Sequence, residues 1–234
     1  MYDILSFVID NLFEILFWII VLYFTVVLFI HRDFYGKGFL LKKQGKYLRA
    51  IEVFSEITKS PRPSHLYAKG YCNYMLGYFQ HAIKNLEKAI ELKLNRINVY
   101  YLLAVLYAEE GKFDIAFEYL EKGEKIQNNF GFLNKLTKHE RNDYLGWVYH
   151  LKGESGKAIE LYDAAIPIWM KNIQKLKKVN EYYSAPCYRM GVILLKKGDM
   201  ESSKKLFSLA VMASPESIFA RKSESELEAI AKDN

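Results

Sequence analysis

Apolar residues recur along most of the chain at the spacing of one face of an α-helix, and a glycine interrupts each such stretch. Five glycines are each followed, five positions later, by a small residue that opens a new apolar stripe: Gly45 and Ala50, Gly77 and Ala82, Gly111 and Ala116, Gly153 and Ala158, Gly198 and Ser203. Glycine can adopt the left-handed conformation that ends a helix, and a small residue lets a second helix approach closely. The pattern therefore predicts a series of helix–turn–helix units.

The five glycines are separated by 32, 34, 42 and 45 residues. A period near 34 residues that is stretched by insertions is typical of a solenoid built from repeated helix pairs. Such arrays stack into extended concave surfaces that hold other proteins. An irregular helical bundle with accidental periodicity is the alternative.

The residues around these glycines resemble the tetratricopeptide repeat (TPR), a Leu-Gly-x-x-Tyr pattern followed by Ala, an aromatic residue and Pro. The matching residues are Leu103-Ala104, Tyr107, Ala116 and Leu120; Leu145-Gly146, Tyr149, Ala158 and Tyr162; Met190-Gly191, Leu194, Ser203, Phe207, Ala210 and Pro215. The resemblance covers residues 31–216 and implies an all-α solenoid of about five repeats, at 31–62, 63–96, 97–130, 139–183 and 184–216. Pro61 and Pro63, in place of one terminal proline, make the repeat boundaries less certain.

A second feature is an apolar N-terminal segment. Ile15 to Ile30 are sixteen residues without a charge, close to the roughly 20 residues that cross a bilayer. No Lys or Arg precedes position 32, and residues 31–34 make a poor cleavage site, so residues 1–30 are expected to be an uncleaved transmembrane helix and not a signal peptide. A buried apolar helix lying in the repeat groove is the alternative.

The charges that flank this segment predict its orientation. Only Asp3, Asp10 and Glu14 precede it, whereas Arg32 and four lysines between positions 37 and 46 follow it. Because positive residues stay on the cytoplasmic side, the repeats are expected to be cytoplasmic, on a single-pass protein of the inner (cytoplasmic) membrane. A periplasmic domain remains the alternative.

Net charge and cysteine content add little to this assignment. The net charge is +6, and the first thirty residues carry −3, which leaves +9 on the remainder. That charge suits an anionic leaflet, a nucleic acid or simply a solvated surface, but no groove-reading helix or zinc knuckle supports nucleic-acid binding. Cys72 and Cys187 form neither a disulfide framework nor a metal spacing.

Catalytic motifs are absent from the sequence. It holds no phosphate-binding glycine loop, no Gly-x-Ser-x-Gly elbow and no His-Glu-x-x-His pair, and its five histidines are scattered. We therefore expect no enzymatic activity, no catalytic residue, no metal and no cofactor.

The TPR resemblance also implies a binding face, because the first helix of each pair lines the concave groove in that family. In phase with the glycines, the groove positions are mostly aromatic: Tyr35, Phe39, Tyr67, Tyr71, Tyr74, Tyr101, Trp147 and Tyr188. The Lys and Asn that clamp a terminal carboxylate in chaperone-binding members are absent from the matching positions. An aromatic groove suits an apolar peptide or an amphipathic helix. The alternative is that these side chains are filled internally, by the C-terminal helix or by packing between helices.

Three further segments are assigned from their patterns. Residues 128–138 are predicted to be a loop, because Asn128, Asn129 and Gly131 break the helix. Pro167 to Ser184 is predicted to prolong the second helix of repeat four and to pack its apolar stripe on the solenoid. The alternative is that its basic face, with Lys171, Lys175 and Lys178, rests on a membrane or an acidic partner. Residues 217–234 are expected to form a capping helix and tail.

Together these features predict a membrane-anchored TPR scaffold that binds protein partners, in a bacterial envelope or motility assembly. One alternative is a regulatory subunit of a membrane enzyme or transporter that acts through its transmembrane helix, where Asp3, Asp10 and Glu14 share a face. Another is a periplasmic-side assembly factor.

Overall fold

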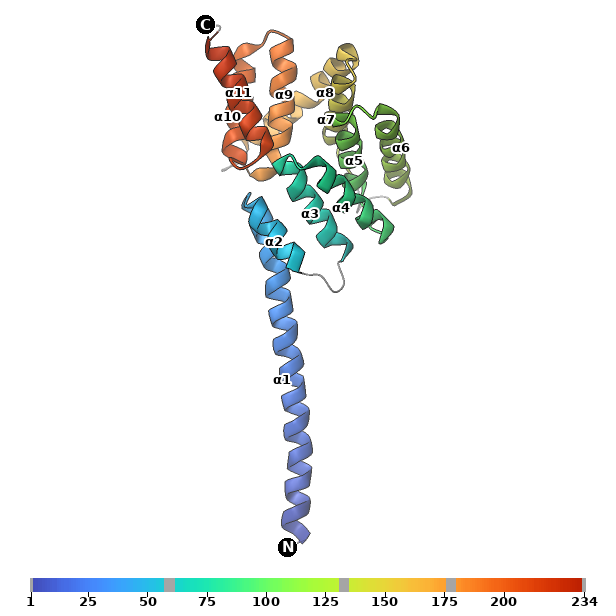
Figure 1. The fold of residues 1–234 in the computed structure, drawn as a ribbon, viewed down its shortest axis with the longest axis vertical. Helices are drawn as coiled ribbons and strands as arrows, with labels where there is room; N and C mark the ends of the chain where they lie inside the picture. Colours follow the sequence, from blue (N-terminus) through green and yellow to red (C-terminus); the bar gives the residue numbers. More distant parts are fainter. Residues whose placement is uncertain (1, 57–61, 131–134, 176–179, 233–234) are drawn as a thin grey trace.

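The protein is described by a computed structural model that covers residues 2–56, 62–130, 135–175 and 180–232. Within these ranges the side chains at 2–10, 13, 15, 26–35 and 127–130 lie outside the description. All elements of the described chain are helices (Figure 1): α1 Tyr2–Lys43, α2 Tyr47–Glu56, α3 Pro63–Leu76, α4 Phe79–Glu91, α5 Ile97–Glu109, α6 Phe113–Phe130, α7 Lys138–Leu151, α8 Ser155–Gln174, the 3-10 turn η2 Glu181–Tyr183, α9 Ser184–Lys196, α10 Met200–Ala213 and α11 Ile218–Lys232.

The predicted turn chemistry is confirmed at all five glycines. Gly45, Gly77, Gly111, Gly153 and Gly198 have φ between 73° and 88°, in the left-handed region. At each turn the amide of the residue after the glycine donates to the carbonyl five residues earlier, as from the amide of residue 78 to the carbonyl of residue 73 at 2.8 Å. These bonds satisfy the carbonyls that the end of the first helix leaves free. Each helix therefore reverses into its partner within a few residues.

Inside each pair the two helices touch where a small residue on the first faces a large side chain on the second. A Cβ added to Gly191 would lie 2.6 Å from the Phe207 ring, and one added to Gly146 would lie 2.8 Å from the Tyr162 ring. Gly38 with Phe54 and Gly70 with Leu86 repeat the arrangement. All four contacts join residues sixteen positions apart, so the same interlock recurs from pair to pair.

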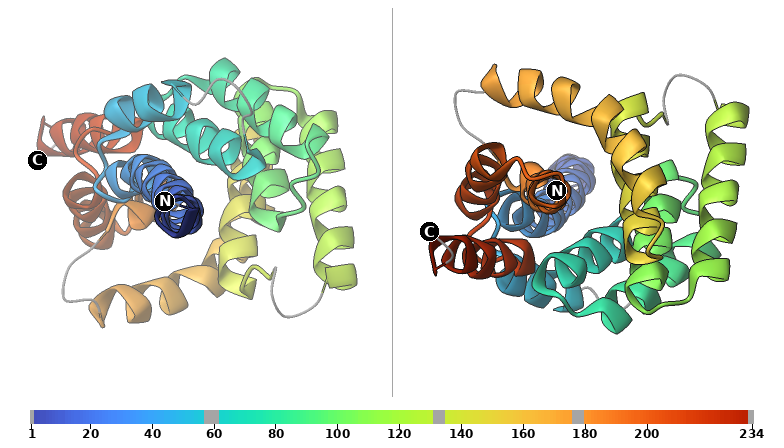
Figure 2. Two further views of the ribbon diagram at one scale, coloured as in Figure 1. Left: turned by 90° about the horizontal axis from the view of Figure 1, so that it is seen from below. Right: turned by 90° about the horizontal axis from the view of Figure 1, so that it is seen from above.

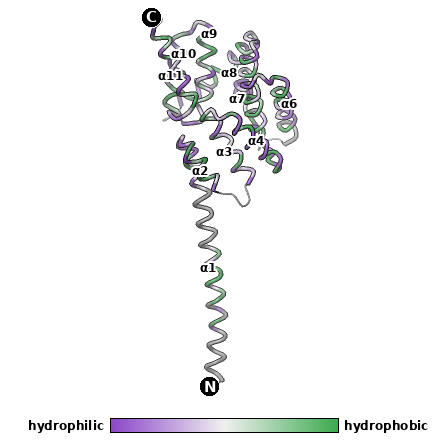
Figure 3. Tube along the Cα trace, viewed as in Figure 1, coloured by the Kyte–Doolittle hydropathy of each residue, from purple (hydrophilic) through white to green (hydrophobic). Residues whose placement is uncertain are grey.

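The N-terminal helix α1 runs away from the solenoid, and only its C-terminal part packs against α2 (Figure 1). Ten of its described apolar side chains are 48–65% exposed, among them Trp18 and Tyr23, and the middle of the helix is coloured hydrophobic in Figure 3. They do not lie in the repeat groove, which was the alternative placement. Among the described residues no helix is long and apolar enough to cross a membrane, so the transmembrane helix expected at 1–30 is not supported there. The run from Ile15 to Ile30 lies partly outside the described side chains.

The two inserted segments, residues 128–138 and 167–184, agree with their predicted structures to different degrees. Helix α6 continues to Phe130, so the loop predicted to begin at Asn128 starts later, and residues 131–134 lie outside the description. Helix α8 continues through Pro167 and buries Trp169 and Ile173, as expected of an apolar stripe packed on the solenoid. The predicted end at Ser184 is wrong, because α8 ends at Gln174 and Ser184 is the first residue of α9.

The solenoid curls until its last elements contact its first repeats (Figure 2). Helix α11 packs on α9 and α10 and also touches α3. The hydroxyl of Tyr47, at the start of α2, lies 2.8 Å from the Ser214 hydroxyl that follows α10. Arg221 of α11 donates to the carbonyl of Leu76, at the end of α3, over 3.1 Å. The curl brings side chains from distant repeats into one interior.

This packing predicts opposite effects for two glycine substitutions. Gly191→Ala should lower the free energy of unfolding by about 1–3 kcal/mol, because the new methyl group meets the Phe207 ring. Gly156→Ala should leave stability unchanged or raise it by up to about 1 kcal/mol, because that helical position has open space around it. Urea unfolding followed by circular dichroism measures both, and an equal effect of the two changes would contradict the interlock.

Candidate functional site

The structure describes the side chains of seven of the eight predicted groove residues, in three kinds of environment. Tyr74, Tyr101, Trp147 and Tyr188 are buried, with exposed fractions of 2–8%. Tyr67 and Tyr71 are half-buried, and Phe39 is 36% exposed. The side chain of Tyr35 lies outside the described residues. Four of the eight are therefore covered by the protein itself, as the alternative of internal filling expects.

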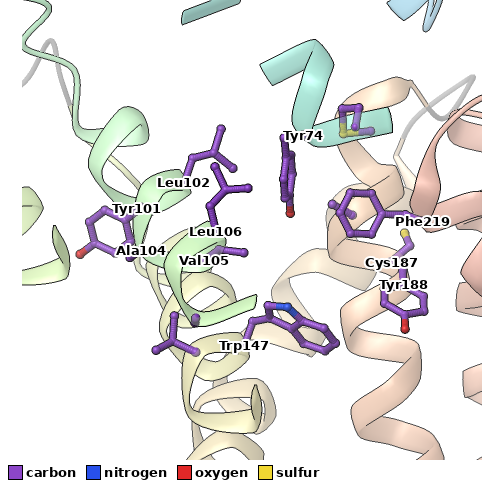
Figure 4. Packing of buried hydrophobic residues seen from close by; sticks show 14 of the residues in the cluster. Tyr74, Tyr101, Leu102, Ala104, Val105, Leu106, Trp147, Cys187, Tyr188 and Phe219 are labelled. Carbon is purple, nitrogen blue, oxygen red and sulfur yellow. The ribbon is translucent and has the colours of Figure 1, made fainter. Parts of the chain in front are cut away.

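Four of these residues, Tyr71, Tyr74, Trp147 and Tyr188, line one continuous aromatic wall inside the curl, and the last three are labelled in Figure 4. The Tyr71 ring lies 6.4 Å from that of Tyr74, and the Trp147 ring lies 5.9 Å from that of Tyr188. Phe219 of α11 joins the two halves, because its ring centroid is 5.1 Å from Tyr74 and 5.9 Å from Tyr188. The wall thus runs from repeat two to repeats four and five through the C-terminal helix.

The other predicted groove residues contact different neighbours. Tyr101 packs on the Tyr144 ring at 5.7 Å and donates its hydroxyl to Glu124 of α6. Phe39 packs on Phe54 at 5.1 Å, within the first repeat. These two side chains hold helices together and do not join the wall.

An ion pair lies beside this wall, and sequence reasoning did not select it as a site. The Arg189 guanidinium contacts the Asp143 carboxylate at 2.8 Å, and both side chains are only 2% exposed. The Tyr162 hydroxyl donates to the same carboxylate over 2.9 Å. Burial raises the pKa of Asp143, and the positive charge of Arg189 opposes that rise. Two features of the sequence could have indicated this pair. Asp143 stands at a groove position where other repeats carry tyrosine, and Arg189 lies within an apolar helix.

Next to the pair is a small cavity of about 20 Å³, enough for one water molecule. Three buried side chains at its lining carry polar atoms that have no hydrogen-bond partner in the described chain: Arg189 through Nε and Nη1, Tyr74 through its hydroxyl and Trp169 through Nε1. This lining suits a small hydrogen-bond acceptor. Among the described residues, no group of three or more His, Cys, Asp or Glu side chains is placed to hold a metal ion.

Trp147 also contacts a histidine whose titration is displaced. The His150 ring stacks on Trp147 at 4.7 Å, and the Trp147 Nε1 donates to Glu109 over 2.9 Å. Burial, helped by the charge of Lys196, lowers the pKa of His150 from 6.5 to about 4. The folded protein therefore keeps this ring neutral where an unfolded chain would take up a proton.

Comparison with known proteins identifies the repeats. Residues 66–96, 97–130 and 185–217 match the family model described as Tetratricopeptide repeat. A TPR repeat-containing protein of Methanocaldococcus jannaschii is 29% identical in an alignment of 188 residues that covers 75% of this chain, and the chain spans about a third (31%) of that protein's length.

Two solved structures are similar to this chain to different degrees. TTC0263, a thermophilic TPR protein of Thermus thermophilus, is 19% identical and has a TM-score of 0.52, over 84% of this chain and 98% of that one. MamA is 22% identical with a TM-score of 0.44, over 74% of this chain and 92% of that one.

The displaced titration of His150 predicts how stability depends on pH. Because the folded pKa lies below the unfolded value, its contribution to stability is complete above about pH 6.5 and is lost as the pH falls toward 4. Replacing His150 with Gln should make the loss of stability between these pH values shallower. Urea midpoints at pH 7, 5.5 and 4.5 measure this, and His81→Gln, at an exposed position on α4, is the control.

Proposed function

We propose that this chain, a tetratricopeptide repeat protein of all-α fold, is a scaffold that mediates protein–protein interactions through the inner face of its curled solenoid. The single observation that carries the proposal is the repeated helix pair, because stacked pairs create an extended surface to which each repeat contributes side chains. The protein acts by binding and not by chemistry of its own.

Tyr67 and Tyr71 of α3 are the part of the predicted groove from which contact with a partner can start. Both rings are half-buried, so each presents some surface to solvent. The Lys42 ammonium lies 4.6 Å from the Tyr71 ring centre, which adds a positive charge beside the apolar ring. A tyrosine offers a large apolar area and a polar tip at low entropic cost, and this combination suits a peptide or an amphipathic helix.

The proposal extends to the N-terminal helix as an anchor in the inner membrane. What supports it is the uncharged run from Ile15 to Ile30, together with described apolar side chains exposed on consecutive positions of α1, from Leu16 to Ile20. Consecutive residues point to all sides of a helix, and a helix that is apolar all round needs an apolar environment. The basic residues that follow the run favour repeats on the cytoplasmic side, in a bacterial envelope or motility assembly.

Two other functions remain as outcomes of the tests. A regulatory subunit of a membrane enzyme or transporter would use α1 itself as its contact, through Asp3, Asp10 and Glu14; the first two lie outside the described side chains, and Glu14 is exposed. A periplasmic-side assembly factor would have the opposite topology.

The groove proposal predicts that Tyr67→Ala and Tyr71→Ala together weaken partner binding. Aromatic residues at interface centres contribute about 2 kcal/mol each, so each change should lower affinity by roughly 30-fold. The measurement is the recovery of crosslinked partner from native membranes. Ile115→Ala, at an apolar residue of α6 that is 37% exposed and lies outside the predicted groove, is the control. Equal recovery from all variants of unchanged helicity would reject this face as the binding surface.

The anchor proposal predicts that the full chain stays in the membrane fraction after alkaline carbonate washing. A chain lacking residues 1–30 should leave that fraction and keep its helical signal. A cytoplasm-only reporter fused after Asn234 should be active. Extraction of the full chain by carbonate would overturn the anchor. If an unrelated single-span anchor keeps the repeats at the membrane but function is lost, α1 is itself recognised, as the regulatory-subunit alternative requires.

A further inference from the structure

The segment Ser214–Lys222, which joins α10 to α11 and forms the first turns of α11, reaches across the curl to the first two repeats. The hydrogen bond between the Ser214 and Tyr47 hydroxyls is fully buried. Ile218 packs against the Gly77 turn, where an added Cβ would lie 3.3 Å from its side chain. We call Ser214–Lys222 the latch, because these contacts join residues that are more than 130 positions apart in the sequence.

Within the latch, Phe219 occupies the aromatic wall. Its side chain is 1% exposed and lies between Tyr74 of α3 and Tyr188 of α9 (Figure 4). Both tyrosines are predicted groove residues, and both are buried. The groove therefore already holds a helical segment of its own chain.

A second contact shows which charge this position accepts. The Arg221 guanidinium donates to the carbonyl of Leu76, the last residue of α3, over 3.1 Å. Carbonyls at the end of a helix carry the negative pole of the helix dipole, so a cation is favoured there. The occupant thus combines an aliphatic and an aromatic residue in succession with an arginine two positions later.

The latch carries the contacts between the C-terminal part of the chain and the first two repeats, and Ser214, Ser217, Phe219 and Ala220 are buried there. In the remainder of the helix, Ile230 is buried and Leu227 packs against the hydrophobic core, whereas the hydrogen bond to α3 is made near the start of the helix. Beside the latch an open cleft of about 820 Å³ borders Arg221, and two large side chains at its lining, Leu48 and Tyr78, are 52% and 50% exposed. An incoming helix would meet these two side chains next to the segment that it must displace, among the charged residues Lys46, Arg49, Glu52 and Glu216.

We propose that the latch is an internal occupant of the binding groove and that the partner is an amphipathic helix that takes its place, presenting an aliphatic–aromatic pair followed by a basic residue. This inference rests on the proposed function and adds the class of partner and the event that admits it. Binding then requires the first turns of α11 to leave Tyr74 and Tyr188, while the five helix pairs stay folded.

A peptide with the sequence of residues 214–232 tests the proposal directly. The fluorescent peptide is titrated into the full-length wild-type chain, the Phe219→Ala chain and the Glu224→Ala chain, which is altered at an exposed position of the same helix. The Phe219→Ala chain should bind the peptide at least about tenfold more tightly than the other two, since its own latch competes less well. A peptide that itself carries Phe219→Ala should lose this binding. Equal binding by the three folded chains would overturn the proposal.

If Phe219→Ala fails to fold, a milder variant measures the same event. Cys187, next to Tyr188, is fully buried, and burial raises its pKa to about 12, so its thiol should react slowly while the latch is closed. In a Cys72→Ser background, Arg221→Ala should label about fivefold faster with a maleimide than Glu224→Ala, as expected for the loss of one hydrogen bond. Identical labelling rates would count against a displaceable latch.

The two proposals fail separately. If the peptide binds as expected but Tyr67→Ala and Tyr71→Ala leave partner recovery unchanged, the latch stands and the proposed function falls. If partner recovery depends on Tyr67 and Tyr71 while the peptide binds all three chains equally, the scaffold stands and the latch falls.

Discussion

The contact between a small residue on one helix and a large side chain sixteen positions later is the constraint on which the rest of the structure depends. At Gly191 and Phe207 the ring occupies space that any added Cβ would enter. This lets the backbones of the two helices approach closely and sets how each pair is packed. Because nearly the same pair is repeated, small rotations between neighbours accumulate in one direction. The curl in Figure 2 is the sum of those rotations.

The curl gives the protein an interior that a straight array would lack. The Asp143–Arg189 pair and the aromatic wall lie there, contributed by repeats two, four and five and by α11. Removing two charges from water costs more than their attraction reliably returns, so the pair is weak evidence for stability. The pair instead specifies how repeats four and five stack. Asp143 on α7 and Arg189 on α9 meet only when these two repeats stack in one register.

The same interior explains why a surface suited to binding is partly covered. A solenoid needs a terminal helix to cover its last repeat, and α11 serves α9 and α10 in this way. In a strongly curled array that helix also reaches the second repeat, and Phe219 then packs between Tyr74 and Tyr188. The position of α11 thus both covers the last repeat and fills the groove. A partner helix would have to compete with the contacts of Phe219 and would not enter an empty groove.

The sequence by itself determined the local features of the fold. The glycine turns, the small-to-large contacts within pairs and the apolar stripe of Trp169 and Ile173 follow from residues less than about twenty positions apart, and such patterns report helices and their nearest neighbours well. The sequence also showed that the predicted groove positions carry mostly aromatic residues, because the repeat pattern fixes which positions these are. Whether those aromatics face solvent was decided only by the tertiary structure, because the residues that cover Tyr74 and Tyr188 come from α11, more than 30 positions beyond either of them. No periodic pattern encodes a contact between Tyr47 and Ser214, since it arises from the accumulated curvature of every repeat between them.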